Sequence, residues 1–93
     1  MTSVNIGIVG ATGAVGEVFL RLLEEREFPV GDLLLFASEQ SEGLKLKFRD
    51  NEYPISRLQE SAFSGLDLVF FSSGDDISRE WAPKAVAEGA MAI

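Results

Sequence analysis

The 93-residue sequence contains no cysteine and no histidine. It therefore has no thiol nucleophile, no disulfide, no histidine base and no metal site built from cysteine and histidine. We expect no catalytic residue and no metal site in this chain. If the chain serves an enzyme, the reactive groups must come from another part of a longer protein.

Basic residues are also few. Eight lysines and arginines stand against 15 aspartates and glutamates, which gives a net charge of −7. Repulsion between like charges disfavours nucleic acid or an anionic membrane as a partner. No apolar run approaches the roughly 20 residues of a membrane span, and the first residues lack the pattern of a signal peptide. We expect a cytoplasmic protein that binds neither nucleic acid nor membrane.

The first feature that the sequence does contain is a strand-like run that passes directly into a glycine-rich turn. Val4 to Val9 is rich in β-branched residues, and a helix-like pattern starts inside the turn that follows. Such a junction points backbone N–H groups and the positive end of a helix dipole at one place, which suits a dinucleotide pyrophosphate. The alternative is a tight turn that binds nothing. The candidate contacts are Gly10, Thr12, Gly13 and Gly16.

Each glycine has a separate expected task. Gly10 turns the chain sharply off the strand, Gly13 lets phosphate oxygens approach the backbone, and Gly16 lets the helix lie close to the sheet. The helix is expected to continue to Pro29, and a second buried strand to run from Asp32 to Ala37. Together these segments predict a parallel β-α-β unit. The helix's expected buried residues are Val15, Phe19, Leu22 and Leu23.

The next segments predict a hairpin and a second crossover. Leu44 to Phe48 and Tyr53 to Ile55 alternate around a turn at Asp50-Asn51, and Pro54 suggests an edge strand. A single helical turn over Glu60 to Phe63 is followed by a third buried strand over Leu66 to Ser72. Ser78 is the expected cap of a helix that runs to Glu88 and tolerates Pro83 only near its first turn. The residues expected to face the sheet are Trp81, Ala82, Ala85 and Val86.

These segments predict an α/β fold, namely a Rossmann-like, doubly wound and mostly parallel sheet with an appended edge β-hairpin. A further strand begins at Ala90 and has run for only four residues at Ile93. We therefore expect residues 1–93 to be an incomplete N-terminal dinucleotide-binding domain, with the catalytic and dimerisation domain absent from this chain.

Two further segments should meet the glycine turn at the carboxyl ends of the strands. One is Ser38, at the place where an Asp or Glu would bind the ribose hydroxyls of NAD. Its small hydroxyl leaves room for the 2′-phosphate of NADP, whereas Glu39 and Glu42 would repel that phosphate, so the choice between NADP and NAD stays open. A serine that merely ends a strand is the alternative. The other segment is Ser72, Ser73 and Gly74, small residues that allow a ligand to approach.

The combination of these motifs resembles the N-terminus of aspartate-semialdehyde dehydrogenases. The likeness extends over nearly the whole chain. It rests on Ile6 to Gly16, Leu20 to Pro29 with Phe28-Pro29, Ala37-Ser38, Ser41-x-Gly43, Ala62-Phe63-x-Gly65-x-Asp67, Phe71-Ser72-x-Gly74 and Ala82-Pro83-x-Ala85-Val86-x-x-Gly89.

The resemblance implies a parent enzyme that reductively dephosphorylates aspartyl phosphate to aspartate semialdehyde with NADPH, through a cysteine thioester, in lysine, threonine and methionine biosynthesis. The cysteine, its histidine base and the substrate arginines would lie beyond residue 93, so this chain alone should be inactive. We expect the parent to be a homodimer or homotetramer. The family's cofactor contacts map onto Thr12, Gly13, Ala14, Val15, Ser38, Gln40, Ser41, Ser72, Ser73 and Gly74.

Some positions depart from the family pattern. Gln40 stands where a phosphate-binding arginine is usual, Leu44 where lysine is usual, and Asp75 and Asp76 where small residues are usual. A non-catalytic paralogue of the same family, acting as an interaction or regulatory protein, shares the missing arginine and is one alternative. A reductase of the N-acetyl-glutamyl-phosphate type is another, although the Phe-Pro and Ser-x-Gly segments speak against it.

Overall fold

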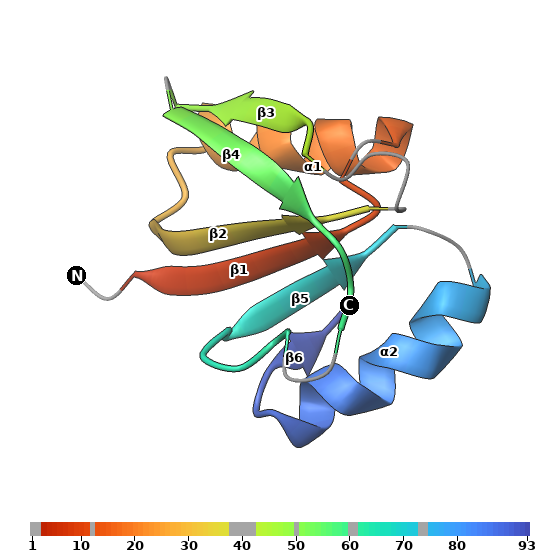
Figure 1. Ribbon diagram of the computed structural model, residues 1–93. Helices are drawn as coiled ribbons and strands as arrows, with labels where there is room; N and C mark the ends of the chain where they lie inside the picture. Colours follow the sequence, from red (N-terminus) through yellow and green to blue (C-terminus); the bar gives the residue numbers. More distant parts are fainter. Residues whose placement is uncertain (1–2, 12, 38–42, 50, 60–61, 73–74) are drawn as a thin grey trace.

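In the computed structural model, which describes residues 3–11, 13–37, 43–49, 51–59, 62–72 and 75–93, six strands form one sheet with a helix on each face (Figure 1). The elements are β1 (Val4–Val9), α1 (Ala14–Glu25), β2 (Val30–Phe36), β3 (Lys45–Phe48), β4 (Asn51–Ser56), β5 (Leu68–Phe71), α2 (Asp75–Ala87) and β6 (Met91–Ala92). Among the described residues, neither helix is long and apolar enough to cross a membrane.

The sheet is mostly parallel and has the order β3-β4-β2-β1-β5-β6. β1 lies between β2 and β5 and pairs in parallel with both, so that Ile8 is level with Leu35 on one side and with Phe70 on the other. Ile8 and Val9 lie on opposite faces of the sheet, and both are almost fully buried because a helix covers each face. The core accordingly forms two apolar clusters, one under each helix. The predicted Rossmann-like, doubly wound fold is confirmed.

The predicted hairpin is present at the edge of the sheet, with two differences in detail. β3 and β4 are antiparallel, and their register pairs Phe48 with Asn51, so Asn51 belongs to β4 and not to the predicted turn, whose other residue, Asp50, lies outside the described residues. Pro54 lies in β4, which is the second strand from the edge. The proline is tolerated there because pairing of β4 with β2 starts only at Ile55.

The buried face of α1 is narrower than the sequence predicts. Gly16, Leu20 and Leu23 are buried, whereas Val15 is 57% exposed and Leu22 is 43% exposed. The prediction that Val15 and Leu22 are buried was wrong, because the apolar residues of α1 occupy a wider arc than the sheet beneath the helix covers.

α1 ends before Pro29, as predicted, and the hairpin contributes to this end. Glu27 takes a left-handed conformation (φ 52°), and the Phe28 N–H donates to the Leu23 carbonyl at 3.0 Å. The Nη2 atom of Arg49 donates to the Leu23 carbonyl at 3.0 Å and to the Phe28 carbonyl at 2.5 Å. A cation from the hairpin therefore satisfies carbonyl groups at the carboxyl end of α1.

α2 begins three residues before the predicted cap, Ser78, and Pro83 consequently lies in its interior. The prediction that Pro83 lies near the first turn was wrong. Ala85 is fully buried, and Trp81 packs edge-on against the buried Phe63. The free energy gained by burying this face of α2 exceeds the cost of the backbone hydrogen bond that Pro83 cannot donate. Val86 is 59% exposed, which also corrects its predicted burial. The predicted turn at 60–63 lies partly outside the described residues.

Asn5 holds three strands together at the amino end of the sheet. Its Nδ2 donates to the Gly65 carbonyl at 3.1 Å, and its Oδ1 accepts from the Asp32 N–H at 2.8 Å. Its own N–H donates to an Asp67 carboxylate oxygen at 2.8 Å. A Cβ at Gly31 would lie too close to the Asn5 amide oxygen, so a larger residue there would displace the Asn5 side chain. One amide thereby fixes the starts of β2 and β5 relative to β1.

We predict that Asn5→Ala lowers the free energy of unfolding by about 1–2 kcal/mol, because two side-chain hydrogen bonds are lost. Urea denaturation followed by circular dichroism measures this change. Asn51→Ala is the matched control, because the Asn51 amide makes one long contact of 3.5 Å to the Arg49 carbonyl. Equal losses in the two variants would contradict the role assigned to Asn5.

Candidate functional site

The candidate site lies where the carboxyl ends of three parallel strands meet. β2 and β5 flank β1 on opposite sides, so the strand order reverses at β1, and open α/β sheets bind ligands at such a point. The N–H groups of Gly10 and Ala11 both donate to the Phe36 carbonyl, at 2.8 and 3.1 Å. The turn that follows β1 is thus anchored to the end of β2.

Ser72 anchors the same turn to the end of β5. Its N–H donates to the Val9 carbonyl at 2.9 Å, and its hydroxyl lies 3.0 Å from the Val9 carbonyl and 3.2 Å from the Gly10 carbonyl. The structure therefore places Ser72 beside the glycine turn, as predicted. The sequence did not predict that the Ser72 hydroxyl group donates to a carbonyl group within the protein. No local pattern in the sequence signals these contacts, because Ser72 is more than 60 positions from Val9 and Gly10.

Gly10 and Gly16 are required by the fold itself. Gly10 has a φ of 88°, which L side chains rarely adopt. A Cβ on Gly16 would lie 2.5 Å from the Gly10 carbonyl oxygen and 2.9 Å from the Ala11 Cα, which is closer than real contacts allow. The absence of both side chains brings the first turn of α1 directly against the end of β1, as the sequence predicted.

Gly13 differs from these two glycines because the fold does not require it. Gly13 is the N-cap of α1 in an extended conformation (φ −81°, ψ 167°), and it is exposed. A Cβ at this position would meet only the Gly10 carbonyl oxygen, at 3.4 Å. A glycine that packing does not demand is consistent with close approach by a ligand.

The amino end of α1 is open. Within the part of the chain that the structure describes, no side chain forms a capping hydrogen bond at Gly13, and Ala14 and Val15, the next two residues, are exposed. Backbone N–H groups at such an end carry a partial positive charge and bind anions. The arrangement can therefore receive a phosphate or pyrophosphate group without any cationic side chain.

The other predicted contacts lie outside the described residues. They are Thr12, Ser38, Gln40, Ser41, Ser73 and Gly74. Glu39 and Glu42, which bear on the choice between NADP and NAD, lie outside the described residues as well. The described part of the chain contains no cluster of three or more acidic residues that could hold a metal ion.

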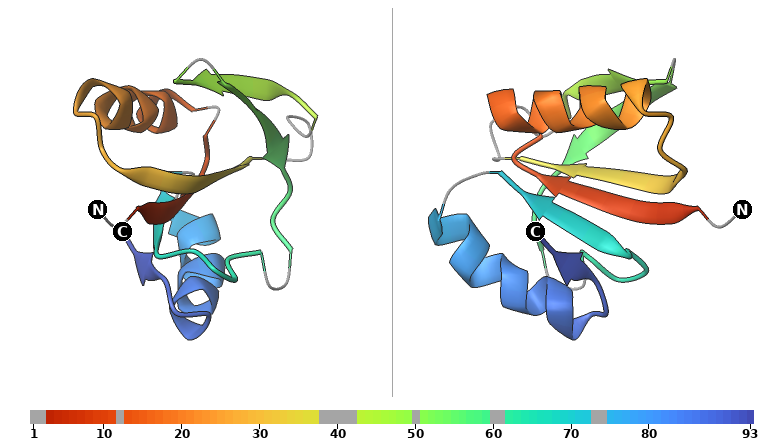
Figure 2. Two further views of the ribbon diagram at one scale, coloured as in Figure 1. Left: turned by 90° about the vertical axis from the view of Figure 1, so that its left-hand side faces the viewer. Right: turned by 180° about the vertical axis from the view of Figure 1, so that it is seen from behind.

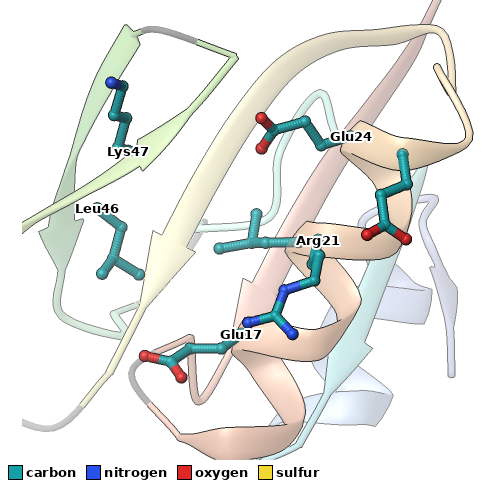
Figure 3. Close-up of a pocket in the computed structure, with 7 residues that line it drawn as sticks. Glu17, Arg21, Glu24, Leu46 and Lys47 are labelled. Carbon is teal, nitrogen blue, oxygen red and sulfur yellow. The ribbon is translucent and has the colours of Figure 1, made fainter.

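A cavity of about 520 Å³ lies elsewhere, between α1 and β3 (Figure 3). Its lining includes Glu17, Glu24 and Glu25, together with Arg21 and Lys47. Three carboxylates against two cations make this groove unfavourable for a phosphate-bearing ligand. We therefore place the candidate site at the glycine turn rather than in this cavity.

Comparison with known proteins decides the family. Residues 5–93 match the family model described as "Semialdehyde dehydrogenase, NAD binding domain". The chain belongs to this family. It is therefore a nicotinamide-dinucleotide-binding domain of the Rossmann type, and the resemblance found in the sequence is confirmed at the level of the family.

Individual relatives agree with this assignment. The chain is 51% identical over 90 residues to aspartate-semialdehyde dehydrogenase of Aquifex aeolicus, covering 96% of this chain and 26% of the relative. The crystal structure of aspartate semialdehyde dehydrogenase II complexed with ASA from Vibrio cholerae matches with a TM-score of 0.93 and 42% identity, over 98% of this chain and 30% of that one.

A more distant structure, the Candida albicans enzyme solved with NADP, shares the fold with a TM-score of 0.78 at 24% identity, over 98% of this chain and 29% of that one. The chain thus spans about a quarter of the length of the curated relative that it matches.

We predict that alanine destabilises the protein far more at one glycine of this turn than at the other. Gly16→Ala should lower the free energy of unfolding by about 1–3 kcal/mol, because its Cβ forces α1 away from Gly10. Gly13→Ala should change it by less than about 1 kcal/mol, because the added Cβ has room. Urea denaturation of the two variants is the measurement, and a larger loss at Gly13 would overturn this interpretation.

Proposed function

We propose that this chain is the NADP(H)-binding portion of an aspartate-semialdehyde dehydrogenase. The observation that carries the proposal is the open amino end of α1, where Gly13 is free of packing constraints at the reversal of strand order. The 51% identity to the Aquifex aeolicus enzyme supports the same conclusion. The pyrophosphate of the cofactor would bind at the backbone N–H groups of the first turn of α1.

NADP is the proposed cofactor, with NAD as the alternative. Ser38 offers a small hydroxyl where NAD-specific domains carry an acidic residue, and this supports NADP. The Candida albicans enzyme, a relative in fold, was solved with NADP. Glu39 and Glu42 oppose the 2′-phosphate, and Gln40 replaces the expected arginine, so we propose a weaker preference for NADP than an arginine would give.

The proposed reaction of the parent enzyme is the reductive dephosphorylation of aspartyl phosphate to aspartate semialdehyde. The bound cofactor would supply the hydride. This chain would bind and orient it, since the sequence has neither a cysteine nor a histidine for covalent or acid–base steps. The thiol that forms the thioester would come from the parts of the enzyme that this chain does not include. We propose that the chain alone is inactive and that the parent acts in the cytoplasm.

Gly13→Ala should weaken NADPH binding by about tenfold or more while the protein remains folded, because the added methyl group lies where phosphate oxygens approach the backbone. Fluorescence titration of the full-length parent with NADPH, and separately with NADH, measures this change. The control is Asn51→Ala, which lies in the hairpin. No binding of either cofactor to the wild-type parent would refute the proposal.

Activity provides a separate test of the proposed reaction. The full-length parent should form NADPH from NADP, aspartate semialdehyde and phosphate, and iodoacetamide should abolish this activity by blocking the thiol. Absorbance at the nicotinamide band follows the reaction. A parent that binds NADPH but shows no activity would instead be the non-catalytic paralogue, and activity with an N-acetyl-glutamyl substrate would indicate the other type of reductase.

A further inference from the structure

The carboxyl edge of the sheet includes a fourth parallel strand end, that of β4. The parallel register pairs Phe36, the last residue of β2, with Ser56, the last residue of β4. The Ala37 N–H donates to the Ser56 carbonyl at 3.2 Å, so the two strands stay paired at the point where β2 ends. Arg57, the next residue along, therefore leaves β4 directly beside the end of β2.

The end of the second strand is where dinucleotide-binding folds distinguish NADP from NAD. The ribose lies there, and an arginine nearby accommodates the 2′-phosphate of NADP. Arginine suits this task because its guanidinium group forms two parallel hydrogen bonds with a phosphate. Residues 37–44, which follow β2, contain Glu39 and Glu42 but no lysine or arginine. If this chain supplies a cation to the 2′-phosphate, the cation must therefore come from another segment.

All eight lysines and arginines of the chain are within the described residues, so those other than Arg57 can be placed. Two are on α2, which follows β5 and lies on the opposite side of the sheet from α1 and the hairpin (Figure 2). Two line the groove between α1 and β3, and two lie at the carboxyl end of α1, away from the glycine turn. In this order they are Arg79 and Lys84, Arg21 and Lys47, and Arg26 and Arg49.

The remaining basic residue, Lys45, is farther from the end of β2 than Arg57 is. Lys45 lies on β3, which is separated from β2 by β4, and it pairs with Pro54. Because Pro54 precedes Arg57 by three residues, Lys45 lies about 10 Å back from the carboxyl edge, at a rise of about 3.3 Å per residue. The order and register of the strands thus place Arg57, and no other basic residue of the chain, next to the end of β2.

We propose that Arg57 binds the 2′-phosphate of NADP and so determines a preference for NADP over NAD. This inference rests on the proposed function, in which the domain binds a nicotinamide dinucleotide. Backbone N–H groups at the amino end of α1 would bind the pyrophosphate, whereas the guanidinium group of Arg57 would bind the phosphate on the ribose. Glu39 and Glu42 oppose this phosphate, so the preference that Arg57 provides is smaller than in a domain without these carboxylates.

Binding of NADPH and NADH to the full-length parent tests the proposal through Arg57→Gln, with Lys45→Gln as the matched control. Both residues are exposed, and each variant removes one positive charge. We expect Arg57→Gln to weaken NADPH binding by about tenfold, because a charge-assisted hydrogen bond to the phosphate is lost. NADH, which has no 2′-phosphate, should bind within about twofold of the wild type, and Lys45→Gln should change neither affinity by more than about twofold. Isothermal titration calorimetry at one ionic strength measures all of these affinities.

Two results would overturn the proposal while the proposed function stands. A structural role for Arg57 would change the affinities for NADPH and NADH equally, and a general effect of charge would give the same loss of NADPH binding in Lys45→Gln. The wild type offers a further measurement that needs no variant, since adenosine 2′,5′-bisphosphate should bind more tightly than AMP, and equal binding would also contradict the proposal. A wild type that binds neither NADPH nor NADH would refute the proposed function itself, so the two failures are distinguishable.

Discussion

The contact between Gly16 and Gly10 determines the geometry of this domain. Because neither residue has a side chain, the first turn of α1 lies directly against the carbonyl group that ends β1. This contact fixes where the helix begins and which way its amino end points. Backbone hydrogen bonds then connect this turn to the two neighbouring strands. The N–H groups of Gly10 and Ala11 donate to Phe36 at the end of β2, and the N–H group of Ser72, which follows β5, donates to Val9. The candidate site is therefore built on the ends of the sheet strands rather than on a separate loop.

The opposite end of the sheet is held by different chemistry. There Asn5 links β1 to the starts of β2 and β5 through side-chain and backbone hydrogen bonds. The strands are thus fixed at the amino end by an amide and at the carboxyl end by close backbone packing. The two apolar clusters fill the space between these ends and the helices.

Much of this arrangement follows from local patterns in the sequence. A β-branched run predicts β1 and an apolar run predicts β5, and the roles of Gly10 and Gly16 follow from sterics alone. The exposure of Val15 and Leu22 could not be predicted from the sequence. The helical spacing of apolar residues shows which of them share a side of the helix, but it does not show which of them a neighbouring element covers. The hydroxyl contacts of Ser72 join residues more than 60 positions apart, and no local pattern encodes such a pair.

Arg49 gives α1 an electrical asymmetry. The last turn of the helix has no basic residue of its own, and the guanidinium of Arg49, carried by the hairpin, binds carbonyl oxygens at that end. The negative pole of the helix is thus neutralised by a residue that follows it by more than 20 positions, whereas none of the described side chains caps the positive pole at Gly13. Among the described residues, α1 thus has one pole that a side chain neutralises and one that no side chain caps, and the uncapped pole lies at the candidate site.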